Sequence, residues 1–177
     1  MRKLLIVLAI SLFSFSAVRA QDVSGIIKVN PLGMAFGVFN ATYEKPLNEK
    51  SSVTVGASYF NWSALRISGM GGRLGYRFYL GNNTTSPEGL FVSPVLDLNS
   101  YSYSYRDEDP NTGEWITRKE SVFSVGGGVQ GGYQWVWDSG VALDLFFGYG
   151  YRAAKFESYD YSGGYPMLGL AVGYAFQ

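Results

Sequence analysis

The residues best suited to chemistry in this chain are charged side chains that recur in segments with an alternating, strand-like pattern. They stand on the face of each segment that otherwise carries small residues, opposite the large apolar ones. Paired carboxylates can serve as the acid and base of an enzyme, whereas carboxylates beside cations can form a buried structural layer. The residues concerned are Lys28, Glu44, Arg73, Arg77, Asp97 and Asp144, with Arg152 as a further candidate.

The face that carries small and charged residues is expected to point into a barrel. A basic residue facing lipid near the middle of a bilayer would cost about 2–4 kcal/mol. An eight-stranded barrel leaves an interior just wide enough for side chains, so the charges would pair with one another and with Gln130 and Gln134. We expect a structural network that closes the lumen, rather than a catalytic, cofactor-binding or metal site. The expected layers are Arg73 with Asp97, and Glu44 with Arg77 and Asp144.

Residues 126–131 satisfy the G-x-G-x-x-G spacing of dinucleotide-binding loops. That motif binds pyrophosphate only where a strand ends and a helix begins, because the helix N-terminus supplies the donors. Here a strand pattern resumes at Tyr133. Interior glycines that relieve crowding in a narrow barrel are therefore the better interpretation, and no nucleotide cofactor is expected.

A second motif imitates the start of a calcium-binding loop. Asp107, Asp109 and Asn111 match its first three oxygen ligands, but Thr112 replaces the required glycine and Arg118 replaces the bidentate glutamate. A solvated loop tip is therefore the favoured interpretation, and no metal is expected.

The alternation that positions these residues is clearest near the C-terminus. Large residues occupy the odd positions of 141–151 and the even positions of 168–176, with mostly small ones between. Membrane barrels turn a large apolar face outward, whereas soluble sandwiches tend to expose charge. We predict an all-β fold, an eight-stranded antiparallel up-and-down transmembrane β-barrel. The expected strands are 25–30, 38–45, 52–62, 73–80, one from 90, 122–137, 141–151 and one ending at 176, with a glycine-rich loop over 68–72.

The N-terminal residues are typical of a secretory signal peptide. Arg2 and Lys3 are basic, residues 4–18 are mainly apolar, and small residues precede a cleavage point after Ala20. The apolar stretch is shorter than the ~20 residues that a membrane helix needs. We therefore predict a signal peptide over 1–20 and a single outer-membrane barrel domain over 21–177.

The composition argues against several functional classes. The chain contains no Cys and no His, which removes disulfides, thiolate catalysis and the usual general base at neutral pH. Its formal net charge is zero and it has no basic run, so we expect no nucleic acid partner. Aromatic residues make up 17% of the chain, a content that the interfacial belts of a membrane barrel would use.

The connections between the expected strands alternate between short and long. In outer-membrane barrels this layout places both termini on the periplasmic side and the long connections, here near 106–120 and 155–165, on the cell exterior. The alternating Tyr101, Tyr103 and Tyr105 form either an adhesive face or part of the interfacial belt. The belt is the favoured interpretation.

Several short motifs follow one another along the chain. They are Asn30-Pro31-Leu32-Gly33, Tyr43-Glu44, Leu47-Asn48-Glu49-Lys50-Ser51, Gly75-Tyr76-Arg77-Phe78-Tyr79-Leu80 and Gly131-Gly132-Tyr133-Gln134-Trp135. Together they resemble a family of small, mostly uncharacterised outer-membrane β-barrel proteins of the OmpA and OmpX general type. The resemblance spans nearly the whole region after residue 20 and implies an eight-stranded barrel without a known activity.

These observations favour an integral protein of a bacterial outer membrane with a structural or surface-interaction role and no catalytic activity. Its expected partners are outer-membrane lipid or lipopolysaccharide, and the barrel-insertion machinery during assembly. A secreted lipocalin-like barrel that binds an apolar ligand is the first alternative, because alternation alone does not say which face is inside. A small pore, or an enzyme that uses serine or carboxylates, is the second.

Overall fold

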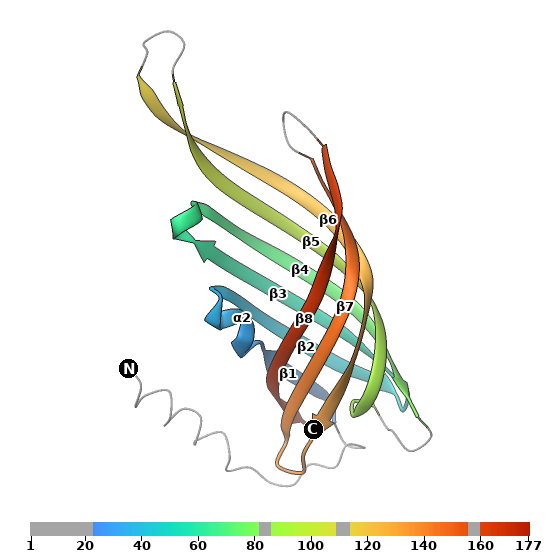
Figure 1. Cartoon of the computed structure of the whole chain (residues 1–177). Helices are drawn as coiled ribbons and strands as arrows, with labels where there is room; N and C mark the ends of the chain where they lie inside the picture. Colours follow the sequence, from blue (N-terminus) through green and yellow to red (C-terminus); the bar gives the residue numbers. More distant parts are fainter. Residues whose placement is uncertain (1–22, 82–85, 109–113, 156–159) are drawn as a thin grey trace, which may run out of the picture.

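The chain folds into eight antiparallel strands that close into a barrel, as the computed structural model shows (Figure 1). Each strand pairs with the next along the chain, and the last pairs with the first. The structure describes residues 23–81, 86–108, 114–155 and 160–177, so the predicted signal peptide lies outside the described part. The predicted all-β, up-and-down barrel is confirmed.

The described elements follow one another as a meander with two short helical turns. Within the described residues, no helix is long and apolar enough to cross a bilayer. The elements are β1 (Gly25–Val29), α2 (Pro31–Ala35), β2 (Val38–Asn48), β3 (Ser51–Trp62), η2 (Ser63–Leu65), β4 (Ile67–Leu80), β5 (Gly89–Glu108), β6 (Trp115–Val136), β7 (Val141–Lys155) and β8 (Asp160–Phe176).

The two-residue period sets which face of each strand is inside. On β7, Phe147 is 69% exposed and Leu145 is exposed, whereas Asp144, which points to the opposite face of the strand, is 1% exposed. On β8, Val172 is exposed and Gly169 is buried. Most of the large apolar side chains therefore cover the outside of the barrel, and the small and charged ones point into its interior.

Strand β4 is longer than the sequence pattern predicts. Its first residues include the glycines at 69 and 71, which were expected to lie in a loop. Both glycines face the interior, where a Cβ at Gly69 would meet the ring of Phe60 and one at Gly71 would meet the amide of Asn99. The glycines thus make room for inward side chains of neighbouring strands instead of forming a turn.

The connection between β5 and β6 also differs from the expectation. Much of the predicted polar loop over 106–120 is strand, because β5 and β6 stay paired from Gly89 opposite Gln134 to Glu108 opposite Trp115. This β5–β6 hairpin projects well past the ends of the other strands (Figure 1). The predicted exterior segment is therefore mainly an extended, two-stranded ribbon.

Candidate functional site

Four charged side chains meet inside the barrel and form what we call the deep layer: Lys28, Glu44, Arg77 and Asp144. The Nζ atom of Lys28 lies 2.5 Å from Glu44 Oε2 and 2.8 Å from Asp144 Oδ2. Arg77 Nη2 lies 2.6 Å from Asp144 Oδ2, and its Nη1 lies 3.3 Å from Glu44 Oε2. All four residues are at most 2% exposed, so two cations and two anions neutralise one another out of contact with solvent.

Uncharged groups complete the deep layer. Ser52 and Tyr79 each donate a hydrogen bond of 2.5 Å to Glu44 Oε1. Gln134 accepts from Lys28 at 2.7 Å and from Arg77 at 3.0 Å. The Arg77 guanidinium also lies 3.9 Å from the centre of the Phe91 ring. These bonds use most of the remaining hydrogen-bonding capacity of the buried charges, which makes their burial tolerable, although Arg77 Nε and Asp144 Oδ1 have no hydrogen-bond partner among the described residues.

The charged groups of the deep layer and Gln134 come from five strands and meet at one level of the barrel. Lys28 comes from β1, Glu44 from β2, Arg77 from β4, Gln134 from β6 and Asp144 from β7. An eight-stranded barrel is narrow enough for side chains to fill its cross-section. Because the charged groups are almost fully buried, the deep layer closes the lumen at this level.

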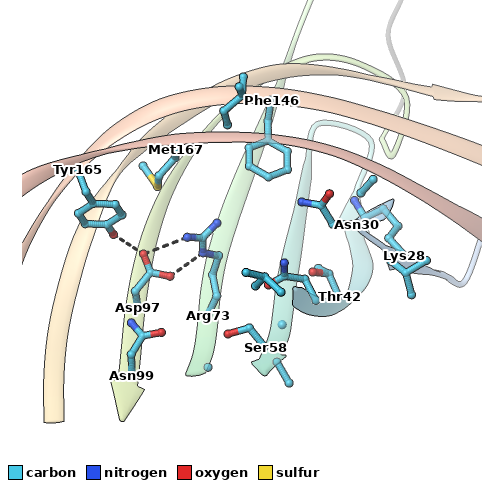
Figure 2. Close-up of a pocket in the computed structure, with 18 of the residues that line it drawn as sticks. Lys28, Asn30, Thr42, Ser58, Arg73, Asp97, Asn99, Phe146, Tyr165 and Met167 are labelled. Carbon is cyan, nitrogen blue, oxygen red and sulfur yellow. Dashed lines mark hydrogen bonds and ion pairs between the residues drawn. The ribbon is translucent and has the colours of Figure 1, made fainter. Parts of the chain in front are cut away.

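A second group, the shallow layer, consists of Arg73, Asp97 and Tyr165. Arg73 Nε lies 2.6 Å from Asp97 Oδ1, and Arg73 Nη2 lies 3.2 Å from Asp97 Oδ2, which makes the pair bidentate. The Tyr165 hydroxyl donates to the second of these oxygens, as Figure 2 shows. The Arg73 side chain is 35% exposed, so the shallow layer is in contact with an open space.

That open space is a pocket of about 470 Å³ in the lumen. The pocket extends from Lys28 in the deep layer to Asn30 and Trp62, which lie where β1 and β3 end. Figure 2 shows Arg73 and Asp97 beside it, with Phe146 and Met167 on another wall. The lumen is therefore closed at the deep layer and hollow from there toward the end of the barrel that bears the β5–β6 hairpin.

The structure brings together all six residues of the expected network, in the two expected groups, and adds Lys28 to the deeper one. It does not bring in Gln130, whose buried side-chain oxygen accepts no hydrogen bond in the described part of the chain. Gln130 lies opposite Ser93 and Gly148, away from the charged groups of either layer. Its expected participation is therefore wrong.

The structure also corrects the interpretation of the alternating tyrosines. Tyr101 and Tyr103 continue the face of β5 that carries Asp97, so they lie on the inward side and not in a lipid-facing belt. The Tyr101 ring lies 5.6 Å from that of Phe60, an inward residue of β3. Tyr101 and Tyr103 are an even number of residues from Asp97, and this spacing could have predicted that they share its inward face.

The dinucleotide-like motif lacks the local structure that its chemistry needs. Residues 126–131 lie inside β6, with strand on both sides and no helix N-terminus. Asp107 pairs with Arg118 across the hairpin at 2.7 Å. Asp109, Asn111 and Thr112 lie outside the described residues.

Comparison with known proteins finds a structural likeness and a family. The crystal structure of the N-terminal β-barrel domain of Pseudomonas aeruginosa OprF superposes with a TM-score of 0.45 and 12% sequence identity, over 87% of this chain and 98% of that one. No curated protein sequence matches the chain. The family described as "Protein of unknown function (DUF3575)" matches residues 4–172, so the chain belongs to this family.

Proposed function

We propose that the protein is an integral β-barrel of a bacterial outer membrane with a surface-interaction role. The observation that carries this proposal is the inverted distribution of side chains. Phe147 and Leu168 are 69% and 71% exposed on the outside, while Lys28 and Asp144 are 1% exposed inside. A water-soluble protein seldom exposes so continuous an apolar surface, whereas lipid requires it.

The orientation follows from strand pairing. Gly25 at the start of β1 lies opposite Phe176 at the end of β8, so the first and last strands meet at one end of the barrel. In outer-membrane barrels this is the periplasmic end. The β5–β6 hairpin lies at the opposite end and would therefore stand outside the cell.

The β5–β6 hairpin is the surface we propose for interaction. The backbone N–H of Ser104 donates to the carbonyl of Arg66, the residue after η2. Beyond Ser104, β5 has no described neighbour except β6, and β6 pairs with β7 only from Phe123 onward. The ribbon exposes Trp115 at 69% and Tyr105 at 40%. Tyr, Trp and Arg are enriched at binding hot spots.

The rival functions fit this arrangement less well. A lipocalin needs an apolar cavity and a polar exterior, the reverse of what is observed. A pore needs an open lumen, which the deep layer obstructs. An enzyme without His or Cys would have to rely on the luminal carboxylates, and Glu44, Asp97 and Asp144 are each held in ion pairs. We therefore propose no catalytic activity, with outer-membrane lipid and the insertion machinery as partners.

An epitope inserted in the connection between β5 and β6 should be detected by antibody on intact cells. The matched control is the same epitope between Asp138 and Ser139, in the turn between β6 and β7 at the opposite end. This control should be detected only after permeabilisation. The reverse pattern would overturn the orientation and with it the proposed surface role.

The purified protein should form no steady channels in a planar lipid bilayer, because the deep layer fills the lumen with paired side chains. A porin reconstituted in the same way serves as the positive control. Reproducible conductance steps from the wild-type chain would show that ions pass the deep layer, and the protein would then be better described as a small pore.

A further inference from the structure

We propose that the pocket between the deep layer and the hairpin end of the lumen binds a small organic anion, with Arg152 as the residue that holds its carboxylate. Nothing in the proposed surface role requires this pocket to bind a ligand. The inference depends on three features of the described residues: an uncompensated cation, a pocket of ligand size and walls of two different polarities.

Arg152 is the uncompensated cation. Its guanidinium lies 4.3 Å from the centre of the Tyr165 ring and 5.8 Å from that of Tyr101. In the described part of the chain it forms no ion pair, and its Nε has no hydrogen-bond partner. The aromatic rings fix the position of the guanidinium without neutralising it, which leaves its donors available to an anion.

Glycines on the neighbouring strands make this position possible. A Cβ on Gly150 would lie 2.8 Å from Tyr165 Cζ, and one on Gly126 would lie 3.3 Å from its hydroxyl oxygen. The Tyr165 ring therefore lies directly against the bare backbone of β6 and β7. In that position its hydroxyl reaches Asp97 and its face supports Arg152.

The charges around the pocket give it a net positive charge. Lys28, at its floor, is neutralised by Glu44 and Asp144, and Arg73 is neutralised by Asp97. Arg152 contributes one further positive charge, and no carboxylate in the described residues forms an ion pair with it. In a narrow space with low-dielectric walls, this charge favours an anionic solute over a neutral one of equal size.

The walls indicate an organic anion and not a bare inorganic one. Phe146 and Met167 form an apolar side, and Ser58, Asn99 and Thr42 form a polar side (Figure 2). The volume of about 470 Å³ lies within the range of pockets that hold small-molecule ligands. A hydrogen bond from Arg152 to a carboxylate would be charge-assisted, while a ring or short chain of the same ligand would contact Phe146 and Met167.

Calorimetric titration of the refolded full chain in dodecyl maltoside micelles tests the proposal, with benzoate as the probe. We expect saturable binding with one site per chain. Benzamide, which keeps the shape and loses the charge, should not bind. Acetate, which keeps the carboxylate and loses the ring, should bind about tenfold more weakly or worse, because a methyl group buries much less apolar surface than a ring.

Variants at two arginines localise the site. Arg152→Met should weaken benzoate binding at least about tenfold, the usual effect of losing a charged hydrogen bond. Arg152→Lys should keep most of the affinity. Arg118→Met makes the same charge change on the hairpin, outside the pocket, and should bind benzoate as the wild type does. A heat-dependent shift in gel mobility checks that each variant is folded.

Three results would contradict the proposal. These are a wild-type chain that does not bind benzoate, unchanged benzoate affinity in Arg152→Met, and acetate that binds as tightly as benzoate. None of them bears on whether the barrel resides in the outer membrane or on the role of the hairpin, so failure here is separable from failure of the proposed function.

Discussion

Replacing Arg77 with alanine is expected to lower the free energy of unfolding by about 3–5 kcal/mol, the cost of leaving a buried ion pair without one partner. Arg77 is 2% exposed and contacts both carboxylates of the deep layer. Without it, Lys28 alone faces Glu44 and Asp144, which leaves one buried negative charge unneutralised. Urea unfolding in lipid vesicles, followed by tryptophan fluorescence, measures the change.

Two further variants test whether the loss of stability comes from leaving a buried charge unpaired. The double variant Arg77→Met with Asp144→Leu removes one cation and one anion together and should cost much less than Arg77→Ala. Arg118→Ala breaks an ion pair whose side chains are 48% and 46% exposed, and such pairs contribute at most about 1 kcal/mol. Equal stability of wild type and Arg77→Ala would mean that solvent reaches the deep layer.

Replacing Gly132 with alanine is expected to destabilise the barrel by about 2–3 kcal/mol, near the upper end of what overpacking costs. A Cβ at this inward position would lie 2.2 Å from the backbone oxygen of Leu145 and 2.9 Å from Phe146 Cα. Backbone of a neighbouring strand cannot move aside as a flexible side chain can. Urea unfolding in lipid vesicles measures this decrease in the free energy of unfolding.

The neighbouring glycine provides the matched control. Gly131 is next in sequence but points outward, and a Cβ there would come no closer than 3.5 Å to the backbone oxygen of Phe91. Gly131→Ala should therefore change stability by less than about 1 kcal/mol. If the two variants are equally stable, the inward packing of β6 against β7 is not as described.

The sequence predicts the faces of the strands well because the two-residue period is a direct consequence of strand geometry. The grouping of Arg73 with Asp97, and of Arg77 with Asp144, could likewise be anticipated by counting residues from the expected turns. The sequence pattern predicts that Lys28 faces the interior of the barrel but does not assign it to either layer. Its strand, β1, is only five residues long, and residue counting alone does not give the stagger between strands of a closed barrel.

Other features could not be found from local patterns. Polar residues with turn propensity predicted a loop near 106–120, but pairing between β5 and β6 overrides that preference. The glycines at 69 and 71 are typical of a loop, but in the structure they accommodate Phe60 and Asn99 from adjacent strands. The contact between Arg152 and Tyr165 joins β7 and β8 and depends on register.

The claim that the apolar outside of the barrel lies in lipid is tested most directly by labelling single cysteines in outer membranes. The chain has no natural Cys, so each variant carries one reporter. A lipid-soluble maleimide should react with Phe147→Cys and Val172→Cys, whose positions face outward, and not with Asp144→Cys or Gly169→Cys, whose positions are buried in the lumen. Labelling of the inward pair with protection of the outward pair, or recovery of the chain outside the membrane fraction, would contradict the account.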